Sequence, residues 1–154
     1  MIRPLTRADL PRLIEFWSQH WGGGEMIVHG ESFRPEQLNG FITEDWSGVV
    51  TYIIQNSSCE IISLNSLKEN RGIGTALIGE VIKEARRQNC QRLFLVTTND
   101  NLHALGFYQR RGIEIATIRR GAVNETRKIK PTIPLIGMNN IPLHDEIELE
   151  MLLK

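Results

Sequence analysis

The stretch "ENRGIGTAL", residues 69–77, places two glycines at the start of a predicted amphipathic helix. Gly72 and Gly74 lack a Cβ atom, so the backbone at these positions can approach another group closely. The N-terminus of a helix also presents N–H groups without intrahelical partners and a partial positive charge. Together these features predict a phosphate-binding loop that leads into a helix.

Two common phosphate loops do not fit this stretch. A Walker loop requires glycine, four residues and then Gly-Lys-Ser/Thr, and this lysine is absent. The dinucleotide fingerprint GxGxxG directly follows a strand, whereas residues 68–71 are four polar residues that precede Gly72. Leu77 also occupies the position of its third glycine. Neither ATP or GTP through a Walker loop nor a dinucleotide is therefore expected.

The N-terminal part predicts a strand followed by a helix. Residues 2–5 are a short strand candidate, and Thr6 with Asp9 three residues later resembles a capping box. Apolar residues then recur at helical spacing, namely Leu10, Leu13, Ile14 and Trp17. Residues 26–40 are ambiguous, apart from a short helix that is expected after Pro35.

The middle of the chain alternates strand and helix patterns. Three β-branched segments separated by turn residues predict an antiparallel meander over residues 41–44, 49–54 and 59–64. The following patterns predict a helix over 73–88 and a strand over 93–96 that is buried on both faces. A second helix is expected over 101–111, where Gly112 ends it, and a further strand over 113–118.

The C-terminal part is less regular. Three prolines and a glycine mark residues 120–142 as a long excursion, with one helical turn expected around 123–129. Residues 146–151 alternate polar and apolar side chains, as a half-buried strand does. The whole pattern predicts a single α/β domain over residues 1–154, with a mixed, mostly antiparallel sheet of about six to seven strands and helices on both faces.

Composition narrows the class of protein. The 154 residues are 41% hydrophobic and 23% charged, which is ordinary for a globular domain. No apolar run approaches the ~20 residues that span a membrane, and the N-terminus has no signal-peptide pattern. Cys59 and Cys90 form no CxxC pair and are expected to be buried, reduced thiols. A cytoplasmic protein without a metal or a membrane partner is therefore expected.

Charge is unevenly distributed although the formal net charge is zero. Residues 68–130 hold 13 Lys/Arg against 6 Asp/Glu, a balance of +7, whereas residues 1–67 and 131–154 carry −4 and −3. A basic middle between acidic flanks suits an anionic ligand beside a cationic one. Solvated faces without a partner explain the same pattern, and both interpretations remain open.

Two motifs resemble those of the GNAT superfamily of acyl-CoA-dependent N-acetyltransferases. They lie in "LKENRGIGTALI" (67–78) and "LVTTNDNLHALGFYQRRGI" (95–113). The first signature, (Gln/Arg)-x-x-Gly-x-(Gly/Ala), is met by Gly72 and Gly74. The second, Asn-x-x-Ala-x-x-Phe-Tyr followed by a glycine, is met by Asn101, Ala104, Phe107, Tyr108 and Gly112. The order of strands and helices agrees with that of the family over about residues 1–118.

This resemblance implies acetyl-CoA as the cosubstrate. Its pyrophosphate is expected at the glycine loop, and the preceding strand is expected to offer its backbone to the pantetheine arm. Glu69 stands where the family has Gln or Arg, so only its backbone N–H suits a pyrophosphate, and Lys68 or Arg71 supplies the positive charge. The implied cofactor-binding residues are Ile62, Ser63, Leu64, Glu69, Asn70, Arg71, Gly72, Ile73, Gly74, Thr75, Asn101 and Tyr108.

The resemblance also implies catalytic roles. Tyr108 is expected to protonate the departing thiolate, with a core tyrosine as the alternative. Glu60 is the candidate base, because strand alternation places it on one face with Ile62; a surface glutamate is the alternative. Asn101 is expected to cap its helix and to touch the cofactor. His29 lies in the loop that covers the acceptor site in this family and is a substrate-binding candidate.

The function implied is acetyl transfer from acetyl-CoA to a primary amine by direct attack in a ternary complex. The acceptor is a small amine, an amino acid or a protein N-terminus, and residues 20–40 and 120–145 would select it. Glu146, Glu148 and Glu150 either attract a cationic acceptor or charge an edge strand. A homodimer is left open.

Two other classes of function remain open. The first is an acyl-CoA-binding sensor or regulatory module without catalysis. The second is a basic interaction surface for nucleic acid, built from Arg86, Arg87, Arg110, Arg111, Arg119 and Arg120. The pI near 6.9 and the absence of a nucleic-acid-binding motif count against that surface, so no nucleic-acid partner is expected.

Overall fold

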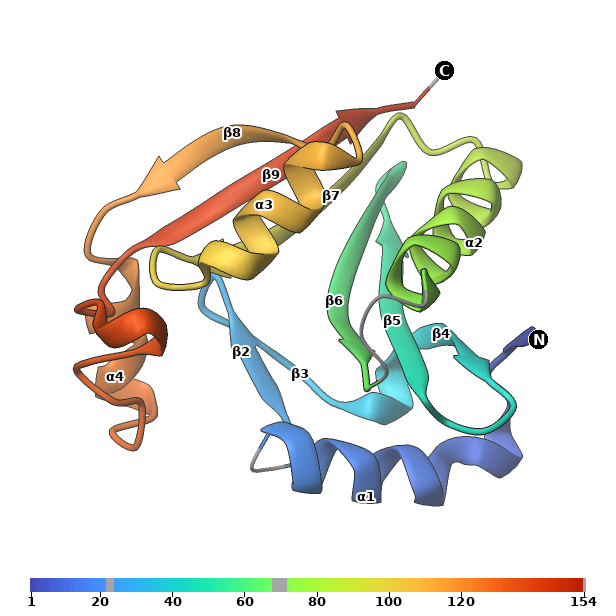
Figure 1. The fold of residues 1–154 in the computed structure, drawn as a ribbon, viewed down its shortest axis with the longest axis horizontal. Helices are drawn as coiled ribbons and strands as arrows, with labels where there is room; N and C mark the ends of the chain where they lie inside the picture. The colour runs from blue at the N-terminus through green and yellow to red at the C-terminus, as the bar shows by residue number, and fades with distance from the viewer. Residues whose placement is uncertain (22–23, 68–71, 154) are drawn as a thin grey trace. The chain divides into compact units, whose positions relative to one another are not determined.

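A computed structural model of the chain describes residues 1–21, 24–67 and 72–153 (Figure 1). The chain forms two compact units. Unit 1 comprises Met1–Leu93 with Leu153–Lys154, and unit 2 comprises Phe94–Leu152. Because each unit has its own strands, helices and buried residues, the two are described one at a time.

The strands of unit 1 form an antiparallel meander. Four strands lie side by side in the order β1 (Ile2–Pro4), β4 (Asn39–Thr43), β5 (Gly48–Gln55) and β6 (Ser58–Ser66). Asn56 and Ser57 both have positive φ in the two-residue turn between β5 and β6, as a type I′ hairpin requires. The predicted meander is confirmed, and its three strands begin one or two residues before the ranges expected from sequence.

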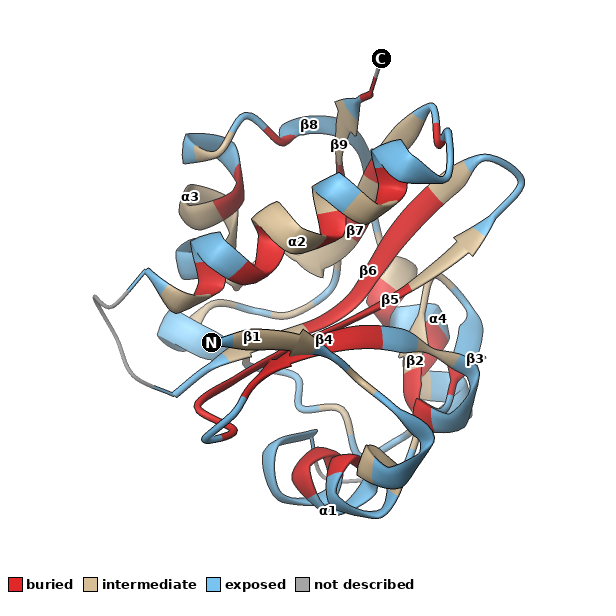
Figure 2. Ribbon diagram, turned by 90° about the vertical axis from the view of Figure 1, so that its right-hand side faces the viewer, coloured by how far each residue is buried: buried red, intermediate tan, exposed pale blue. Residues whose placement is uncertain are grey.

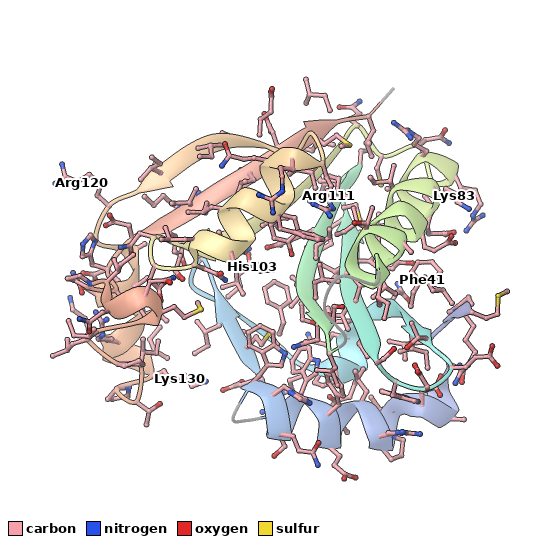
Figure 3. All side chains as sticks on the ribbon, in the orientation of Figure 1. Phe41, Lys83, His103, Arg111, Arg120 and Lys130 are labelled. Atoms are coloured by element: carbon pink, nitrogen blue, oxygen red, sulfur yellow. The ribbon has the colours of Figure 1, made fainter. Side chains whose placement is uncertain are left out.

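Two helices cover opposite faces of this sheet, as Figures 1 and 2 show. Helix α1 (Leu10–Trp21) packs on a core that includes Leu13, Phe16, Trp17, Ile42, Val49 and Ile62. Helix α2 (Ile73–Arg87) turns its apolar side to the other face, where Leu77, Ile78, Val81 and Ala85 are buried. Lys83 lies on the exposed side of α2 (Figure 3). The amphipathic periodicity of both segments therefore predicted which side each helix buries.

Gly48 allows α2 to approach β5 closely. A Cβ atom at this position would lie 2.4 Å from Ile73 Cγ2 and 2.9 Å from Leu77 Cδ1. Real Cβ atoms do not occur at such distances, so a larger residue would require the side chains of Ile73 and Leu77, or the start of α2, to shift. The close packing of α2 against the sheet therefore depends on the lack of a side chain at Gly48.

A hairpin that the sequence left ambiguous completes unit 1. Strands β2 (Met26–Val28) and β3 (Glu31–Phe33) pair in antiparallel fashion around the two-residue turn His29-Gly30. Both turn residues have positive φ, 42° at His29 and 80° at Gly30. The expected short helix after Pro35 is confirmed as a 3₁₀ turn over Pro35–Gln37.

Unit 2 contains a second group of strands. Their order is β7 (Arg92–Thr98, whose first two residues belong to unit 1), β9 (Glu146–Leu152) and β8 (Glu114–Arg119), and β8 and β9 are antiparallel. Helices α3 (Leu102–Arg110) and α4 (Ala122–Ile129) belong to the same unit. Across the described residues, the strands and helices of the two units confirm the predicted mixed, mostly antiparallel α/β class.

Two expectations about these strands are wrong. Strand β9 is not at the edge, because it lies between β7 and β8. Glu146 is buried and lies 3.5 Å from the partly exposed Arg119 guanidinium, so its charge pairs with a cation rather than protecting an edge. Strand β7 is not fully buried on both faces, because Leu93 and Leu95 are buried whereas Phe94 and Val96 are only half-buried.

Polar contacts hold residues 133–145, which include the second half of the predicted excursion, in place. Asp100 is buried, and its carboxylate accepts a hydrogen bond from the Met138 amide at 2.8 Å. Asn99 Oδ1 accepts from the amides of His144 and Asp145 at 3.1 and 2.9 Å. The Arg127 guanidinium on α4 donates to the carbonyls of Ile133, Pro134 and Leu143. This segment is therefore ordered by side chain–backbone hydrogen bonds, and the helical turn expected around 123–129 is confirmed as α4.

Asp9 is expected to stabilise the start of α1. Its carboxylate accepts from the Thr6 amide at 2.7 Å and from the Arg3 guanidinium at 2.7 and 2.8 Å, and these bonds hold the pKa of Asp9 well below its usual range. Asp9→Ala should lower the free energy of unfolding at pH 7 by about 1 kcal/mol, the usual loss on removing a cap.

The pH dependence follows from the lowered pKa of Asp9. The stabilisation is complete above the unfolded pKa near 4 and is lost as the pH falls toward the folded value. Urea unfolding of the wild type and Asp9→Ala should therefore differ less at pH 3 than at pH 7. The exposed Glu36→Gln serves as the matched control. An equal difference at both pH values would contradict the role assigned to the carboxylate.

Candidate functional site

The glycine loop meets α2 at a left-handed residue. Gly72 is the N-cap of α2 and has φ of 69°, a conformation that favours glycine. A Cβ atom at Gly72 would meet nothing within 4 Å, so the space beside it is open. The first helical hydrogen bond runs from the Ala76 amide to the Gly72 carbonyl at 3.0 Å. The amides of Ile73 and Gly74 lie earlier in the chain than the Ala76 amide. These amides suit an anion at the helix start.

Three predicted cofactor residues lie beside this loop in sequence but outside the described residues. They are Glu69, Asn70 and Arg71. Thr75 follows Gly74 in the first turn of α2 and is exposed, whereas Gly74 is buried. The described part of the loop therefore contributes backbone amides and one exposed threonine to the candidate site.

Strand β6 contains a bulge within the segment predicted to contact pantetheine. Thr51 pairs with Ser63 and Tyr52 pairs with Ile61, so Ile62 is an extra residue on β6. A bulge disrupts the ladder locally and redirects side chains, and bulges are common beside functional sites. The buried hydroxyls of Thr51 and Ser63 lie 2.5 Å apart across the two strands.

The bulge determines which side chains share a face of β6. Glu60 pairs with Ile53, and Ile53 packs against the same core as Ile62. Glu60 and Ile62 therefore both lie on the side of the sheet that faces α1, as strand alternation predicted. Leu64 pairs with Val50 one position beyond Thr51, so its side chain lies on the opposite face.

Glu60 forms a buried pair with His29. His29 Nε2 lies 2.7 Å from Glu60 Oε2, and the side chains are 20% and 7% exposed. The hydrogen bond to Glu60 raises the pKa of His29, while burial acts in the opposite direction. The Phe33 ring meets the imidazole edge-on, with centroids 5.9 Å apart. The alternative of a surface glutamate is therefore wrong.

Sequence analysis singled out both residues but did not pair them. They are 31 residues apart, and the turn that presents His29 lies in the segment left ambiguous. The pattern "MIVHGESF" does contain a usable signal, because two short strand candidates flank the dipeptide His-Gly. Recognising the hairpin would have placed His29 at a tight turn.

Helix α3 in unit 2 carries the second motif. Asn101 Oδ1 accepts a hydrogen bond from the Ala104 amide at 3.1 Å, which confirms the predicted cap. Tyr108 is buried, and burial raises the pKa of its hydroxyl. Its ring meets Phe107 edge-on at 5.2 Å. Arg111, labelled in Figure 3, stacks over the other aromatic ring of the motif, with its guanidinium carbon 3.6 Å from the Phe107 centroid.

Several arginines of the predicted basic surface have partners within the chain. Arg87 pairs with Glu84 on α2. Arg119 Nη1 donates to Glu148 Oε1 at 3.1 Å. Arg120 by contrast is exposed and extends away from unit 2 (Figure 3). Part of the positive charge in the middle of the chain is therefore balanced locally.

Unit 2 contains a pocket, and the described residues contain no metal cluster. The pocket has a volume of about 540 Å³ and is lined by Arg120, Gly121, Asn124, His144 and Asp145 of unit 2. The Asp145 carboxylate already accepts a hydrogen bond from the Gly121 amide at 2.8 Å and pairs with His144. Within residues 1–21, 24–67 and 72–153, no group of three or more His, Cys, Asp or Glu side chains is arranged to hold a metal ion.

Residues 13–113 match the model of the Acetyltransferase (GNAT) family. The chain belongs to this family. It is 45% identical over 139 residues to the Uncharacterized protein YdhI of Bacillus subtilis (strain 168), which covers 88% of this chain and 87% of that protein. The resemblance inferred from the two motifs is therefore confirmed, and both motifs lie inside the matched range.

Solved GNAT structures share the fold at low sequence identity. A GNAT family acetyltransferase from Elizabethkingia anophelis with acetyl-CoA bound has a TM-score of 0.71 and 22% identity, covering 99% of this chain and 97% of its own. A Bacillus subtilis acetyltransferase in complex with CoA has a TM-score of 0.69 and 17% identity, covering 99% and 98%. Among the described residues of this GNAT chain, no helix has the length and hydropathy needed to cross a bilayer.

Asn101 is expected to stabilise α3 through its side-chain oxygen. Asn101→Ala removes the acceptor for the Ala104 amide and should lower the free energy of unfolding by about 1 kcal/mol. Asn101→Asp retains a capping oxygen and should cost much less. Chemical denaturation of the three proteins measures both effects. An equal loss in the two variants would contradict the capping role.

Proposed function

We propose that this GNAT protein transfers an acetyl group from acetyl-CoA to a primary amine by direct attack in a ternary complex. The observation that carries the proposal is Gly72, a left-handed N-cap with open space beside it, in the first family motif. That GNAT structures of the same fold are bound to CoA or acetyl-CoA supports the choice of cosubstrate. The chain acts as a single acetyltransferase domain in the cytoplasm and requires no metal.

The family resemblance assigns the proposed cofactor residues to the two motifs. The amides of Gly72 and of residues 73–75 at the start of α2 hold the pyrophosphate, together with Glu69, Asn70 and Arg71. The bulged segment of residues 62–64 offers its backbone to the pantetheine arm, because a bulge leaves one residue outside the ladder. Asn101 contacts the same arm while it caps α3.

The chemistry requires a neutral amine and a proton for the thiolate. Glu60 provides the basic group that removes a proton from the ammonium form of the acceptor. The amine nitrogen then bonds to the thioester carbon and the C–S bond breaks, leaving its electron pair on sulfur. Tyr108, which burial keeps protonated, gives its proton to sulfur and regains one from the amide nitrogen. The products are an N-acetyl amine and CoA.

Binding and turnover are measured separately. Thermal unfolding is followed with acetyl-CoA, CoA, NAD and ATP; a ligand at about 100 times its Kd adds roughly 2.7 kcal/mol. Release of the CoA thiol is then followed with tyramine, spermidine, L-lysine and a peptide that begins with alanine. Stabilisation by acetyl-CoA and CoA alone, with turnover of one amine, is expected. Stabilisation without turnover would favour the acyl-CoA sensor, and no stabilisation would overturn the cofactor assignment.

Gly72→Glu should abolish binding of acetyl-CoA. The substitution adds a negative charge beside the proposed pyrophosphate and forces a side chain into a left-handed conformation, at about 1–2 kcal/mol. Gly79→Glu is the matched control, since it adds the same group to α2 where a Cβ also meets nothing within 4 Å. Calorimetry should find wild-type affinity in Gly79→Glu only. Retained affinity in Gly72→Glu would place the pyrophosphate elsewhere.

Tyr108→Phe should lower kcat by about 100-fold and leave acetyl-CoA affinity nearly unchanged. The reason is that the hydroxyl acts only when the thiolate forms, which is a transition-state role. Phe107→Leu is the control for a change in aromatic packing on α3. Equal kcat in the wild type and Tyr108→Phe would remove the hydroxyl from the mechanism and favour a core tyrosine.

A further inference from the structure

Strand β8 is the outer strand of unit 2. In the order of the strands that the structure describes it comes last, beside β9 (Figure 1). Its outer edge therefore presents backbone N–H and C=O groups that no described strand pairs. The edge strand of unit 1 differs, because β1 has three residues and contains Pro4, and a short strand and a proline both discourage further pairing. Strand β8 has six residues and no proline.

The side chains of β8 are accessible along the strand. Five of its six residues are exposed, and the sixth, Arg119, is half-buried. Two of the exposed residues are isoleucines, Ile115 at 44% and Ile118 at 56%. An edge strand with exposed β-branched apolar side chains is a template for pairing with another chain.

A bulge in β8 places the two isoleucines on one face. Ile115 pairs with Leu149 of β9, and Ile118 pairs with Ile147. Leu149 and Ile147 are two residues apart, so they share a face of the strand. Ile115 and Ile118 are three residues apart and still share that face, because the pairing shifts by one residue between Ile115 and Thr117.

The ends of β8 carry opposite charges on the other face. Glu114 pairs with Glu150 and Arg119 pairs with Glu146, and these two residues of β9 are four positions apart. Glu114 and Arg119 therefore share a face. The Arg119 side chain is held by Glu146 and Glu148 and remains 35% exposed. Because the carboxylates of Glu114 and Glu150 lie on directly opposite residues, they repel each other, and a further cation beside Glu114 would offset this repulsion.

These positions make β8 complementary to a second copy of itself. When two β8 strands pair in antiparallel fashion about a twofold axis, Ile115 lies opposite Ile118 and Glu114 lies opposite Arg119. Residues that lie directly opposite share a face, and both pairs meet this condition because of the bulge. The small side chains of Ala116 and Thr117 then lie at the axis. A parallel pair would place Glu114 beside Glu114, so the charges select the antiparallel direction.

We propose that two copies of this chain form a homodimer in which their β8 strands pair in antiparallel fashion about a twofold axis. Such a contact is isologous, because each strand provides both halves of it. Pairing covers the exposed edge and supplies partners for its backbone groups. The inference goes beyond the proposed acetyltransferase function and does not depend on it.

Sedimentation of the full chain over a wide range of protein concentration tests the association. The wild type should pass from monomer to dimer as the concentration rises. Ile118→Lys should raise the Kd of the dimer at least about tenfold, because an ammonium would lie against Ile115 without a partner. Ile129→Lys, which changes an isoleucine of α4 that is 64% exposed, should leave the Kd unchanged. Thermal unfolding verifies that both variants fold.

Glu114→Lys separates association from folding. In the monomer the lysine lies opposite Glu150 and replaces a repulsion by an attraction, so the thermal stability at low protein concentration should not fall. In the dimer the same lysine lies opposite the second copy's Arg119, so the Kd should rise by about tenfold. Glu36→Lys makes the same change of net charge at an exposed position of unit 1 and is the matched control.

A cysteine near the axis tests the register. Thr117→Cys places one thiol from each copy beside the axis, so mild oxidation should link two chains by a disulfide. Thr132→Cys carries an equally exposed thiol outside β8 and should link far fewer chains. Cys59 and Cys90 are buried in both variants. A gel run without reductant measures the linked fraction.

Each experiment has an outcome that contradicts the dimer. A wild type that stays monomeric at every concentration would overturn it. A dimer whose Kd is the same in Ile118→Lys and Ile129→Lys would use another surface, which also overturns the role of β8. Equal cross-linking of the Thr117→Cys and Thr132→Cys variants would rule out the twofold register. None of these results bears on the proposed acetyltransferase function.

Discussion

Unit 1 depends on the burial of both faces of its antiparallel sheet. With α1 on one face and α2 on the other, the central residues of β4, β5 and β6 are buried, and only their ends are exposed. A polar group in such a layer costs free energy unless it is hydrogen-bonded. Thr51 bonds Ser63 and Glu60 bonds His29 for this reason. The same burial that stabilises the sheet therefore holds a hydrogen-bonded carboxylate at a fixed position.

Local signals in the sequence predicted much of the fold and the glycine at the start of α2. The capping box at Thr6 and Asp9, the turn before β6 and the glycine at the start of α2 depend on residues close together in the chain. A glycine at a helix start indicates its own backbone conformation, so the amino-acid sequence alone is enough to recognise the loop. The meander followed in the same way from β-branched segments and turns.

The remainder could not be predicted because it depends on contacts between distant residues. The burial of Glu60 beside His29 could not be predicted, because His29 lies 31 residues earlier and a local turn signal does not show which strand the turn contacts. The excursion near residue 140 is irregular in sequence because its hydrogen bonds come from Asn99 and Asp100, about 40 residues before it. The interpretation of Glu148 as a charge on an edge strand was wrong because β9 lies between β7 and β8. The order of the strands in the sheet depends on contacts between distant residues.

Gly48 limits which residues this position of β5 can accept. Alanine at that position would press on Ile73 and Leu77, and both belong to the first turns of the helix that Gly72 begins. A residue in the middle of the sheet thus affects the start of α2 through the spacing between two layers. If the first turn of α2 binds the cofactor as proposed, a substitution at Gly48 would change cofactor affinity from a position on the sheet rather than in the loop.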